Sequence, residues 1–402
     1  MGMTEQFILE HRNDDVRALA LGHHHEGVDI QYALTQIEGW QIACRKVPDW
    51  AAADGIRYPR HLSLEQCTSQ YVAQYKARFI DGLLGNGFTM ADLTGGMGVD
   101  CHFMSRHAAK VCYNEPDAGL AAITAANFNV LGRQDISVSN LRAEDFVNQC
   151  LTDGSHFNLA YLDPSRRSSG GGRLVSIGDC QPDVRILQNS LCDIADHVMV
   201  KLSPMLDLRK ALSELGHVSN VLVLSLAGEC KEMTLVMRKG FEGEPVITAT
   251  DLDNTGVEGM AVSDTLSGYM QPAPVIGKER VVEGTFIYEP HASIMKAALF
   301  KRLAVQTGTC QLHGATHLFW SDRQIPDFPG RQFRLLRVIP FDKRNMGVLM
   351  KCRANVATRN FPLTASQLQQ RLKISDGGQR YLYGVTLADS SRVILDLDRI
   401  KA

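Results

Sequence analysis

Four short segments of the sequence combine residues that could bind a nucleoside and act on a molecule beside it. The first is the turn 92–98, Asp-Leu-Thr-Gly-Gly-Met-Gly, and the others contain Glu115, Asp145 and Asp163. Glycines allow a tight turn and a close ligand approach, and a helix that starts after such a turn presents unpaired amide groups. Taken alone, the turn is compatible with a dinucleotide site or with a connection that binds nothing.

Glu115 and Asp145 extend this signal along the chain. Glu115 comes about 20 residues after the turn, at the end of an apolar segment, where a carboxylate can accept hydrogen bonds from both ribose hydroxyls. Asp145 precedes Phe146, so the acid could accept from an adenine amino group while the ring packs against the base. The alternative for Asp145 is an acidic first turn of a helix, which the helix dipole favours.

The segment 163–167, Asp-Pro-Ser-Arg-Arg, has the composition of a substrate-binding turn. Ligands of open α/β sheets bind at the carboxyl ends of the strands, and an Asp-Pro pair there can accept a hydrogen bond from a substrate amino group. The two arginines could clamp a phosphate, or could simply be solvated in a turn. We predict catalytic roles for Asp163, Pro164 and Arg166, with Lys201 as a further substrate contact.

Alternating strands and helices are expected to position these residues. Seven short apolar segments alternate with helical patterns between residues 88 and 238, which predicts a mostly parallel sheet covered on both faces. The segment between the last two strands is too short for a parallel crossover, so these strands should form an antiparallel hairpin. The expected strands are 88–93, 109–114, 136–139, 158–162, 197–202, 221–226 and 233–238, and the expected helices are 98–107, 117–131, 144–151, 183–195 and 207–215.

The flanking regions have different patterns. Apolar residues recur every three or four positions before the glycine turn, which predicts helices at 16–21, 29–44 and 65–84. After residue 272 the patterns predict two small α+β units, with strands at 285–288, 316–320, 334–339, 347–352, 381–386 and 393–397 and helices at 291–305 and 364–372. We therefore expect a helical region 1–85, an α/β domain 86–240, a segment 241–271 that is a connector or extra strands, and units 272–323 and 324–402.

Charge is divided unevenly along the chain. From residue 272 onward there are 20 Lys and Arg against 10 Asp and Glu, a net of +10, whereas the preceding part carries −12. A basic module on an acidic one is typical of a protein that holds a polyanion with one part and does chemistry with another. Docking of the two parts on each other is the alternative.

Other features argue against a membrane, a disulfide framework or a metal. No run of apolar residues is long enough for a membrane helix, and the ten cysteines are scattered without a CxxC pair, which suits reduced thiols in the cytoplasm. The histidines at 23–25 are more typical of a solvated turn than of a metal site, so no metal is expected.

The glycine turn, Glu115, Asp145 and Asp163 follow the first four expected strands, and as a set they resemble the seven-stranded class I S-adenosylmethionine-dependent methyltransferases. The resemblance implies a Rossmann-like α/β fold. In that family the glycine turn holds the methionine part of the cofactor, the acid after strand two holds the ribose, and the acid after strand three lies at the adenine. It thus implies S-adenosyl-L-methionine as the cofactor, bound by Asp92, Thr94, Gly95, Gly96, Met97, Gly98, Asp100, Glu115, Pro116, Asp145, Phe146 and Asp163.

The segment 163–166 matches the family's (D/N)PP(Y/F/W) amino-methyltransferase motif only in part. Ser165 replaces the second proline, and Arg166 occupies the position of an aromatic residue that stacks on a flipped base. Methylation of a pyrimidine at C5 would require a cysteine nucleophile, which this motif lacks, and Cys180 is a more distant candidate. The identity of the acceptor therefore stays open at this point.

Outside the core, the segments 64–69 and 75–76 resemble a bacterial methyltransferase family with a helical N-terminal region and a C-terminal ferredoxin-like unit followed by a THUMP-like domain. The resemblance implies that this module binds structured RNA, tRNA or rRNA. A methyltransferase acting on a protein side chain or small molecule, and a non-catalytic RNA-binding protein with an inactive cofactor fold, are the alternatives. Basic residues that would contact phosphate are Arg331, Arg334, Arg337, Lys343, Arg344, Lys351, Arg353 and Arg359.

Overall fold

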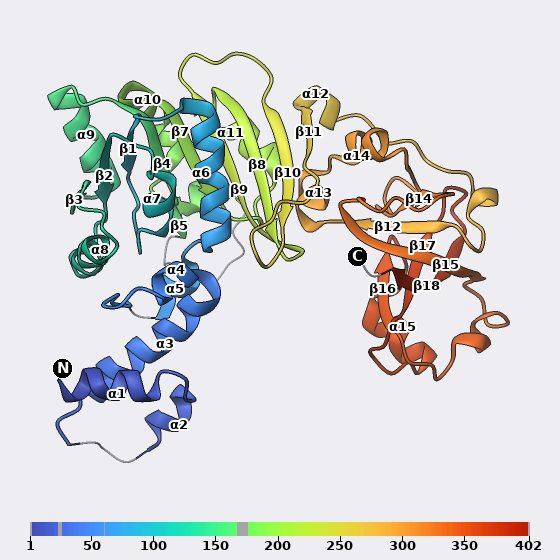
Figure 1. Ribbon diagram of the computed structural model, residues 1–402. Coiled ribbons are helices and arrows are strands. Elements are labelled where there is room, and N and C mark those ends of the chain that lie inside the picture. The colour runs from blue at the N-terminus through green and yellow to red at the C-terminus, as the bar shows by residue number, and fades with distance from the viewer. Residues whose placement is uncertain (1, 23–25, 60, 167–175, 401–402) are drawn as a thin grey trace. The chain divides into compact units, whose positions relative to one another are not determined.

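The structure is a computed structural model that describes residues 2–22, 26–59, 61–166 and 176–400, without the side chains of residues 61, 62 and 166. Contacts divide the chain into two compact units. Figure 1 shows the helices and strands with the chain coloured from its N-terminus to its C-terminus. The first unit comprises Met1–Ser219 and Thr234–Gly243, and the second comprises Asn220–Met233 and Glu244–Ala402. No helix in the described part of the chain is long and apolar enough to cross a membrane.

The core sheet contains all seven strands that the sequence predicts. Its strand order is β11-β10-β8-β9-β7-β4-β1-β2-β3, and β7, β4, β1, β2 and β3 run parallel to one another. The carboxyl ends of these parallel strands therefore meet at one edge, where the candidate residues follow them. The predicted strands are β1 (Thr89–Asp92), β2 (Lys110–Asn114), β3 (Ile136–Ser139), β4 (Phe157–Leu162), β7 (Ala195–Leu202), β8 (Val218–Leu226) and β9 (Glu229–Arg238).

The segment 241–271 forms extra strands rather than a bare connector. β10 (Val246–Leu252) pairs parallel with β8, and β11 (Val262–Thr265) pairs antiparallel with β10, followed by the short helix α12 (Leu266–Tyr269). The sheet consequently has nine strands, two more than the sequence predicts.

Three of the five α-helices that the structure describes between β1 and β8 have an aspartate as N-cap, at Asp117, Asp183 and Asp207. Asp117 accepts a hydrogen bond from Leu120 N at 2.9 Å, and Asp207 accepts one from Lys210 N at 2.8 Å, so each satisfies an unpaired amide of the first turn. A hairpin of two short strands, β5 (Ser165–Arg166) and β6 (Cys180–Gln181), lies beyond β4. The helices are α7 (Val99–Met104), α8 (Ala118–Val130), α9 (Ala143–Asp153), α10 (Val184–Ile194) and α11 (Leu208–Glu214).

The N-terminal helices differ from the prediction at one functionally important place. The expected helix 65–84 is broken between α5 (His61–Gln66) and α6 (Gln70–Leu84). The break is stabilised because the Lys46 ammonium donates to the carbonyls of Leu64, Glu65 and Cys67, at and just after the end of α5. The remaining N-terminal helices are α1 (Met3–His11), α2 (Val16–Ala20), α3 (Ile30–Lys46) and α4 (Pro48–Ala51).

A buried apolar cluster fixes these helices to the start of α7. Trp50 and Leu64 from the N-terminal region pack with Val99 and Phe103 of α7, and all four are nearly or fully buried. Burying large apolar side chains is the main favourable contribution to such packing, about 1.5–3 kcal/mol each. The loop between α5 and α6 is thereby held beside the glycine turn.

The second unit contains a seven-stranded sheet in the order β13-β14-β12-β15-β18-β17-β16. The two predicted α+β units share this sheet, because β12 pairs antiparallel with β15. Its strands are β12 (Phe286–Pro290), β13 (Cys310–Gln311), β14 (Phe319–Ser321), β15 (Gly330–Pro340), β16 (Asn355–Arg359), β17 (Arg380–Thr386) and β18 (Arg392–Ile400), and its helices are α13 (Ala292–Ala297), α14 (Phe300–Thr307) and α15 (Ala365–Leu372).

Two predictions for this unit were wrong. The expected helix 291–305 is interrupted at Ala298, which has a left-handed φ of 51° between α13 and α14. The expected strand 347–352 is instead a 3₁₀ turn over Met346–Leu349, and β16, which was not predicted, follows it. Met346 and Leu349 are both buried, and a spacing of three places both side chains on one face of a 3₁₀ turn.

Candidate active site at the carboxyl edge of the first sheet

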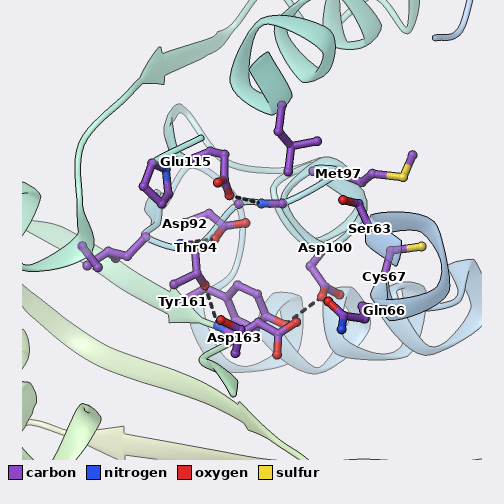
Figure 2. Close-up of a pocket in the computed structure, with 18 of the residues that line it drawn as sticks. Ser63, Gln66, Cys67, Asp92, Thr94, Met97, Asp100, Glu115, Tyr161 and Asp163 are labelled. Carbon is purple, nitrogen blue, oxygen red and sulfur yellow. Dashed lines mark hydrogen bonds between the residues drawn. The ribbon is translucent and has the colours of Figure 1, made fainter. Parts of the chain in front are cut away.

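A pocket of about 410 Å³ lies where β1, β2 and β4 end, and all of its lining residues belong to the first unit. Figure 2 shows Asp92, Glu115 and Asp163 around it, with Ser63, Gln66 and Cys67 of the N-terminal region on the side away from Glu115. A concave pocket of this size with a few convergent polar groups is typical of a small-molecule site.

The glycine turn forms the wall of the pocket that a ligand can approach most closely. A Cβ on Gly95 would lie 2.0 Å from the Tyr113 ring, and a Cβ on Gly98, which has φ of 77°, would lie 2.6 Å from the Phe128 ring. Gly96 has φ of 54°, and a Cβ there would meet only one backbone oxygen, 4.0 Å away. Two of the glycines are therefore required by packing, whereas the third has open space at its Cβ position and a left-handed φ that favours glycine.

We predict that Gly95→Ala destabilises the protein by about 1–3 kcal/mol, because the added methyl group must displace the buried Tyr113 ring. Denaturant unfolding measures this change. Gly82→Ala in α6 is the matched control, because a Cβ there meets nothing within 4 Å and should be neutral or slightly stabilising. Equal stability of the Gly95→Ala variant and the wild type would contradict the packing of the turn.

Glu115 is held rigidly at the edge of the pocket. Its Oε2 accepts from Gly96 N and its Oε1 accepts from Asp117 N, both at 2.9 Å. The residue is buried and lines the pocket directly behind the glycine turn. Each carboxylate oxygen has a second lone pair, so Glu115 can also accept hydrogen bonds from two hydroxyls of a ligand.

Asp92, at the end of β1, is the most buried acid of the pocket. It accepts a hydrogen bond from Thr94 N at 3.1 Å and is only 1% exposed. Burial raises its pKa well above the ordinary value, and the nearby Asp100, Asp163 and Glu115 raise the pKa further by repulsion. A cationic ligand in the pocket would favour the ionised form of this carboxyl.

Asp100, in the first turn of α7, lies at the centre of a buried polar network. The fully buried Lys76 ammonium is 2.9 Å from its Oδ1, and its Oδ2 accepts from Thr68 Oγ1 at 2.6 Å and Tyr161 OH at 2.7 Å. Burial opposes ionisation of Asp100, but Lys76, Lys201 and the Thr68 hydroxyl outweigh it and lower its pKa to about 2. The network connects α6, α7 and β4 below the glycine turn.

Asp163, just after β4, is fixed by Thr94 of the glycine turn and by Lys201 of β7. Its backbone N donates to Thr94 Oγ1 at 2.6 Å, and its Oδ2 accepts from Lys201 Nζ of β7 at 2.5 Å. Its side chain is 37% exposed, so the carboxylate can meet a second molecule at the mouth of the pocket. Lys201, which was predicted to contact substrate, instead forms hydrogen bonds with Asp163 and Thr68 and does not line the pocket.

The structure brings most of the predicted residues together. Asp145 is exposed, and Phe146 is buried in contact with Phe157, so neither lines the pocket, whereas Glu144 does. Pro164 also does not line it, and the side chain of Arg166 and all of Arg167 and 168–172 lie outside the described residues. The predicted residues that do line it are Asp92, Thr94, Gly95, Gly96, Met97, Gly98, Asp100, Glu115, Pro116 and Asp163.

Sequence reasoning missed one wall of the pocket. It is supplied by the end of α5 and the following loop, through Ser63, Gln66, Cys67 and Thr68. The sequence pattern places residues 65–84 in one continuous helix, and it does not indicate the break between Gln66 and Gln70 that brings this loop to the pocket. Other lining residues that were not predicted are Leu93, Val99, Leu120, Arg142, Ala143, Tyr161, Ser165, Gln181 and Pro182.

The pocket offers neither a thiolate nor a metal site among the described residues. Burial raises the pKa of Cys67 to about 11, which leaves it a neutral thiol near pH 7, and Cys180 is buried. No group of three or more His, Cys, Asp or Glu residues in the described part of the chain could hold a metal. The histidines at 23–25 lie outside that part.

Two family models match the C-terminal part of the chain, and one solved structure matches nearly all of it. A ferredoxin-like domain family matches residues 286–329, and a THUMP domain-like family matches residues 330–396. A crystal structure from Porphyromonas gingivalis W83, provisionally named a methyltransferase, is 30% identical, with 98% of this chain and 97% of that chain covered and a TM-score of 0.82. The chain belongs to this methyltransferase family. The methyltransferase thus has the C-terminal ferredoxin-like and THUMP-like domains that the sequence predicts.

Other methyltransferases are similar only at a distance. An S-adenosylmethionine-dependent methyltransferase from Agrobacterium tumefaciens is 12% identical, with a TM-score of 0.33 and 52% of this chain and 64% of that chain covered. Escherichia coli yhhF, also provisionally named a methyltransferase, is 16% identical with a TM-score of 0.32, over 43% of this chain and 87% of its own. Similarity at this level carries no functional argument. No curated protein matches the sequence.

Proposed function

We propose that this methyltransferase transfers a methyl group from S-adenosylmethionine to a base of tRNA or rRNA. The observation that carries the proposal is that the glycine turn, Glu115 and Asp163 line one pocket. This is the set of positions at which the family holds the cofactor and aligns the acceptor. The chain also continues into a basic part with a THUMP-like domain.

The described residues fit S-adenosylmethionine. Open space beside Gly96 admits a ligand against the backbone, and the fixed carboxylate of Glu115 would hold the ribose hydroxyls. Asp92 places an ionisable carboxyl beside the glycine turn, and a ligand with cationic groups would favour its ionised form. When bound, this cofactor supplies an electrophilic methyl group on a positively charged sulfur.

The protein's own contribution to the reaction is alignment and proton acceptance. We assign Asp163 to accept a hydrogen bond from the acceptor amine and then to receive the proton that the methylated amine must lose. Lys201 donates a hydrogen bond to that carboxylate, and Thr94 accepts one from the backbone N of the same residue. The Pro164 carbonyl is the second proposed acceptor of an amine hydrogen.

We predict that cofactor affinity rises with pH because of Asp92. Its raised pKa means that the free protein retains a proton at pH values above the usual aspartate pKa of about 4, whereas the cationic cofactor favours the carboxylate. Binding should then release a proton, and calorimetric enthalpies in buffers of different ionisation enthalpy measure that release. A pH dependence that persists unchanged in an Asp92→Asn variant would contradict this assignment.

The structure separates the predicted phosphate contacts into two groups. Several arginines stabilise buried carboxylates: Arg331 and Arg359 pair with Glu289 at 3.3 and 2.7 Å, and Arg337 pairs with Asp396 at 2.7 Å. Arg353 Nε donates to the Asp376 carbonyl at 3.3 Å. The exposed Arg334, Lys343, Arg344 and Lys351 form no ion pair among the described residues and are the better candidates for contacting phosphate.

We predict that the double variant Lys343→Gln/Lys351→Gln binds bulk tRNA more weakly and with a salt dependence whose logarithmic slope is smaller by about 1–2. Each lysine that contacts a phosphate releases about one counterion, so its loss reduces the slope. The matched control is Lys110→Gln/Lys239→Gln, which removes two exposed lysines from the first unit. Identical slopes for the two double variants would exclude these lysines from RNA binding.

The experiment that tests the function uses tritiated S-adenosylmethionine with separate tRNA, rRNA and protein fractions from a strain that lacks the gene, because only unmodified substrate can accept label. Label in one RNA fraction supports the proposal. Label in the protein fraction alone supports a protein acceptor and overturns it. If the protein binds the cofactor but labels no fraction, RNA is excluded as the acceptor.

A further inference from the structure

Thr68 occupies an unusual position between the two halves of the pocket. It lies in the loop between α5 and α6, is 7% exposed, and reaches the core from the N-terminal region. Its hydroxyl donates to Asp100 Oδ2 at 2.6 Å and accepts from Lys201 Nζ at 3.0 Å. One side chain thus contacts both the α7 carboxylate beside the glycine turn and the lysine that holds Asp163.

These contacts form one continuous path that joins Asp100 to Asp163, two residues that line the pocket. Lys76 fixes Asp100, Asp100 accepts from Thr68, Thr68 accepts from Lys201, and Lys201 donates to Asp163 at 2.5 Å. Asp100 lies on the side where the cofactor is proposed to bind, and Asp163 lies where the acceptor is proposed to bind.

A hydroxyl has a single proton, so the two hydrogen bonds of Thr68 are mutually dependent. Donation to Asp100 orients the lone pairs toward Lys201, and each bond strengthens the other in a poorly solvated site. Removing the hydroxyl would take one hydrogen bond from Asp100, which keeps Tyr161 and Lys76, and one from Lys201, which keeps Asp163. The expected consequence is misalignment of both carboxylates rather than loss of one local contact.

We propose that Thr68 is a positioning residue through which the N-terminal helical region couples the cofactor side of the pocket to the acceptor carboxylate of Asp163. The inference rests on the proposed function, since it assigns Asp100 and Asp163 to the two sides of a methyl transfer. It adds that the loop after α5 is part of the catalytic unit. Lys201 acts with Thr68 and positions Asp163.

The test is a double-mutant cycle on the affinity for S-adenosylhomocysteine, measured by calorimetry on the full chain. Lys201 does not line the pocket, yet Lys201→Met should weaken binding by about fivefold, which corresponds to the net free energy of one hydrogen bond. In the Thr68→Val background the same change should weaken binding by less than about twofold, because the connection is already broken. Thr68→Ser, which retains the hydroxyl, should bind as the wild type does.

Thr316→Val is the matched control, because Thr316 is fully buried in the second unit and donates to the Thr386 carbonyl at 2.7 Å. It should lower the melting temperature without changing the affinity. The proposal is overturned if the effects of Thr68→Val and Lys201→Met are additive, or if folded Thr68→Val binds as the wild type does. If the folded wild type binds no S-adenosylhomocysteine, the proposed function itself fails and this inference fails with it.

Discussion

Replacing Asp163 with asparagine is expected to reduce kcat for methyl transfer by about 10²–10⁴-fold. Asparagine keeps the shape of the side chain, but it cannot receive the amine proton and loses the charge that pairs with Lys201 at 2.5 Å. The asparagine oxygen can still accept a hydrogen bond from Lys201 and so keep Lys201 in contact with Thr68, and the cofactor dissociation constant should therefore change by no more than about threefold. Single-turnover transfer of labelled methyl groups and calorimetric titration measure the two effects.

Asp54→Asn is the matched control for this prediction, because Asp54 is an exposed aspartate of the first unit that does not line the pocket. It should leave both constants unchanged. A kcat for Asp163→Asn within about threefold of the wild type would contradict the assignment of Asp163 as the group that aligns and deprotonates the acceptor.

Replacing Lys76 with methionine is expected to lower the free energy of unfolding by about 3–5 kcal/mol at neutral pH. Lys76 is fully buried, and its removal leaves the Asp100 carboxylate without its ion-pair partner at 2.9 Å in a poorly solvated site. Asp100 has a lowered folded-state pKa, so its ionisation stabilises the native protein above the unfolded value of about 4, and this contribution is lost as pH falls toward about 2.

Without Lys76, the pKa of Asp100 should rise, so the deficit should be smaller near pH 4 than near pH 7. Urea unfolding at the two pH values measures this, and Asp100→Asn combined with Lys76→Met should recover part of the loss. Lys239→Met is the control, because its pair with Asp193 is exposed and should contribute less than about 1 kcal/mol. A deficit for Lys76→Met no larger than that of the control would show that the buried pair is not needed for stability.

The core of the fold was predictable because local signals agreed with it. Apolar segments marked each of the seven predicted strands, and aspartates such as Asp117 and Asp207 marked helix starts by offering side-chain oxygens to unpaired amides. The glycine turn and Glu115 were predictable because each directly follows a strand. The carboxyl ends of neighbouring parallel strands lie at the same edge of the sheet, so the residues that follow them lie close together.

The rest of the site depends on contacts between distant segments, which local patterns do not report. The break after α5 is stabilised by Lys46, a residue in another helix, so the pattern of 65–84 resembled one continuous helix. Lys201 is held by Thr68 and Asp163, and only the assembled sheet shows that it does not face the pocket. Phe146 packs against Phe157 and not beside the pocket. The sequence does not distinguish the two positions, because an aromatic residue is compatible with either a ligand site or the core.

The most direct test of the central claim is a crystal structure of the protein with S-adenosylhomocysteine. We expect the ligand in the pocket between the glycine turn and the loop after α5, with its ribose hydroxyls within hydrogen-bonding distance of the Glu115 carboxylate. The homocysteine part should lie against Gly96, and the sulfur should face Asp163. Ligand bound elsewhere, or a pocket that stays empty at saturating ligand, would contradict the assignment of this site to a methyltransferase cofactor.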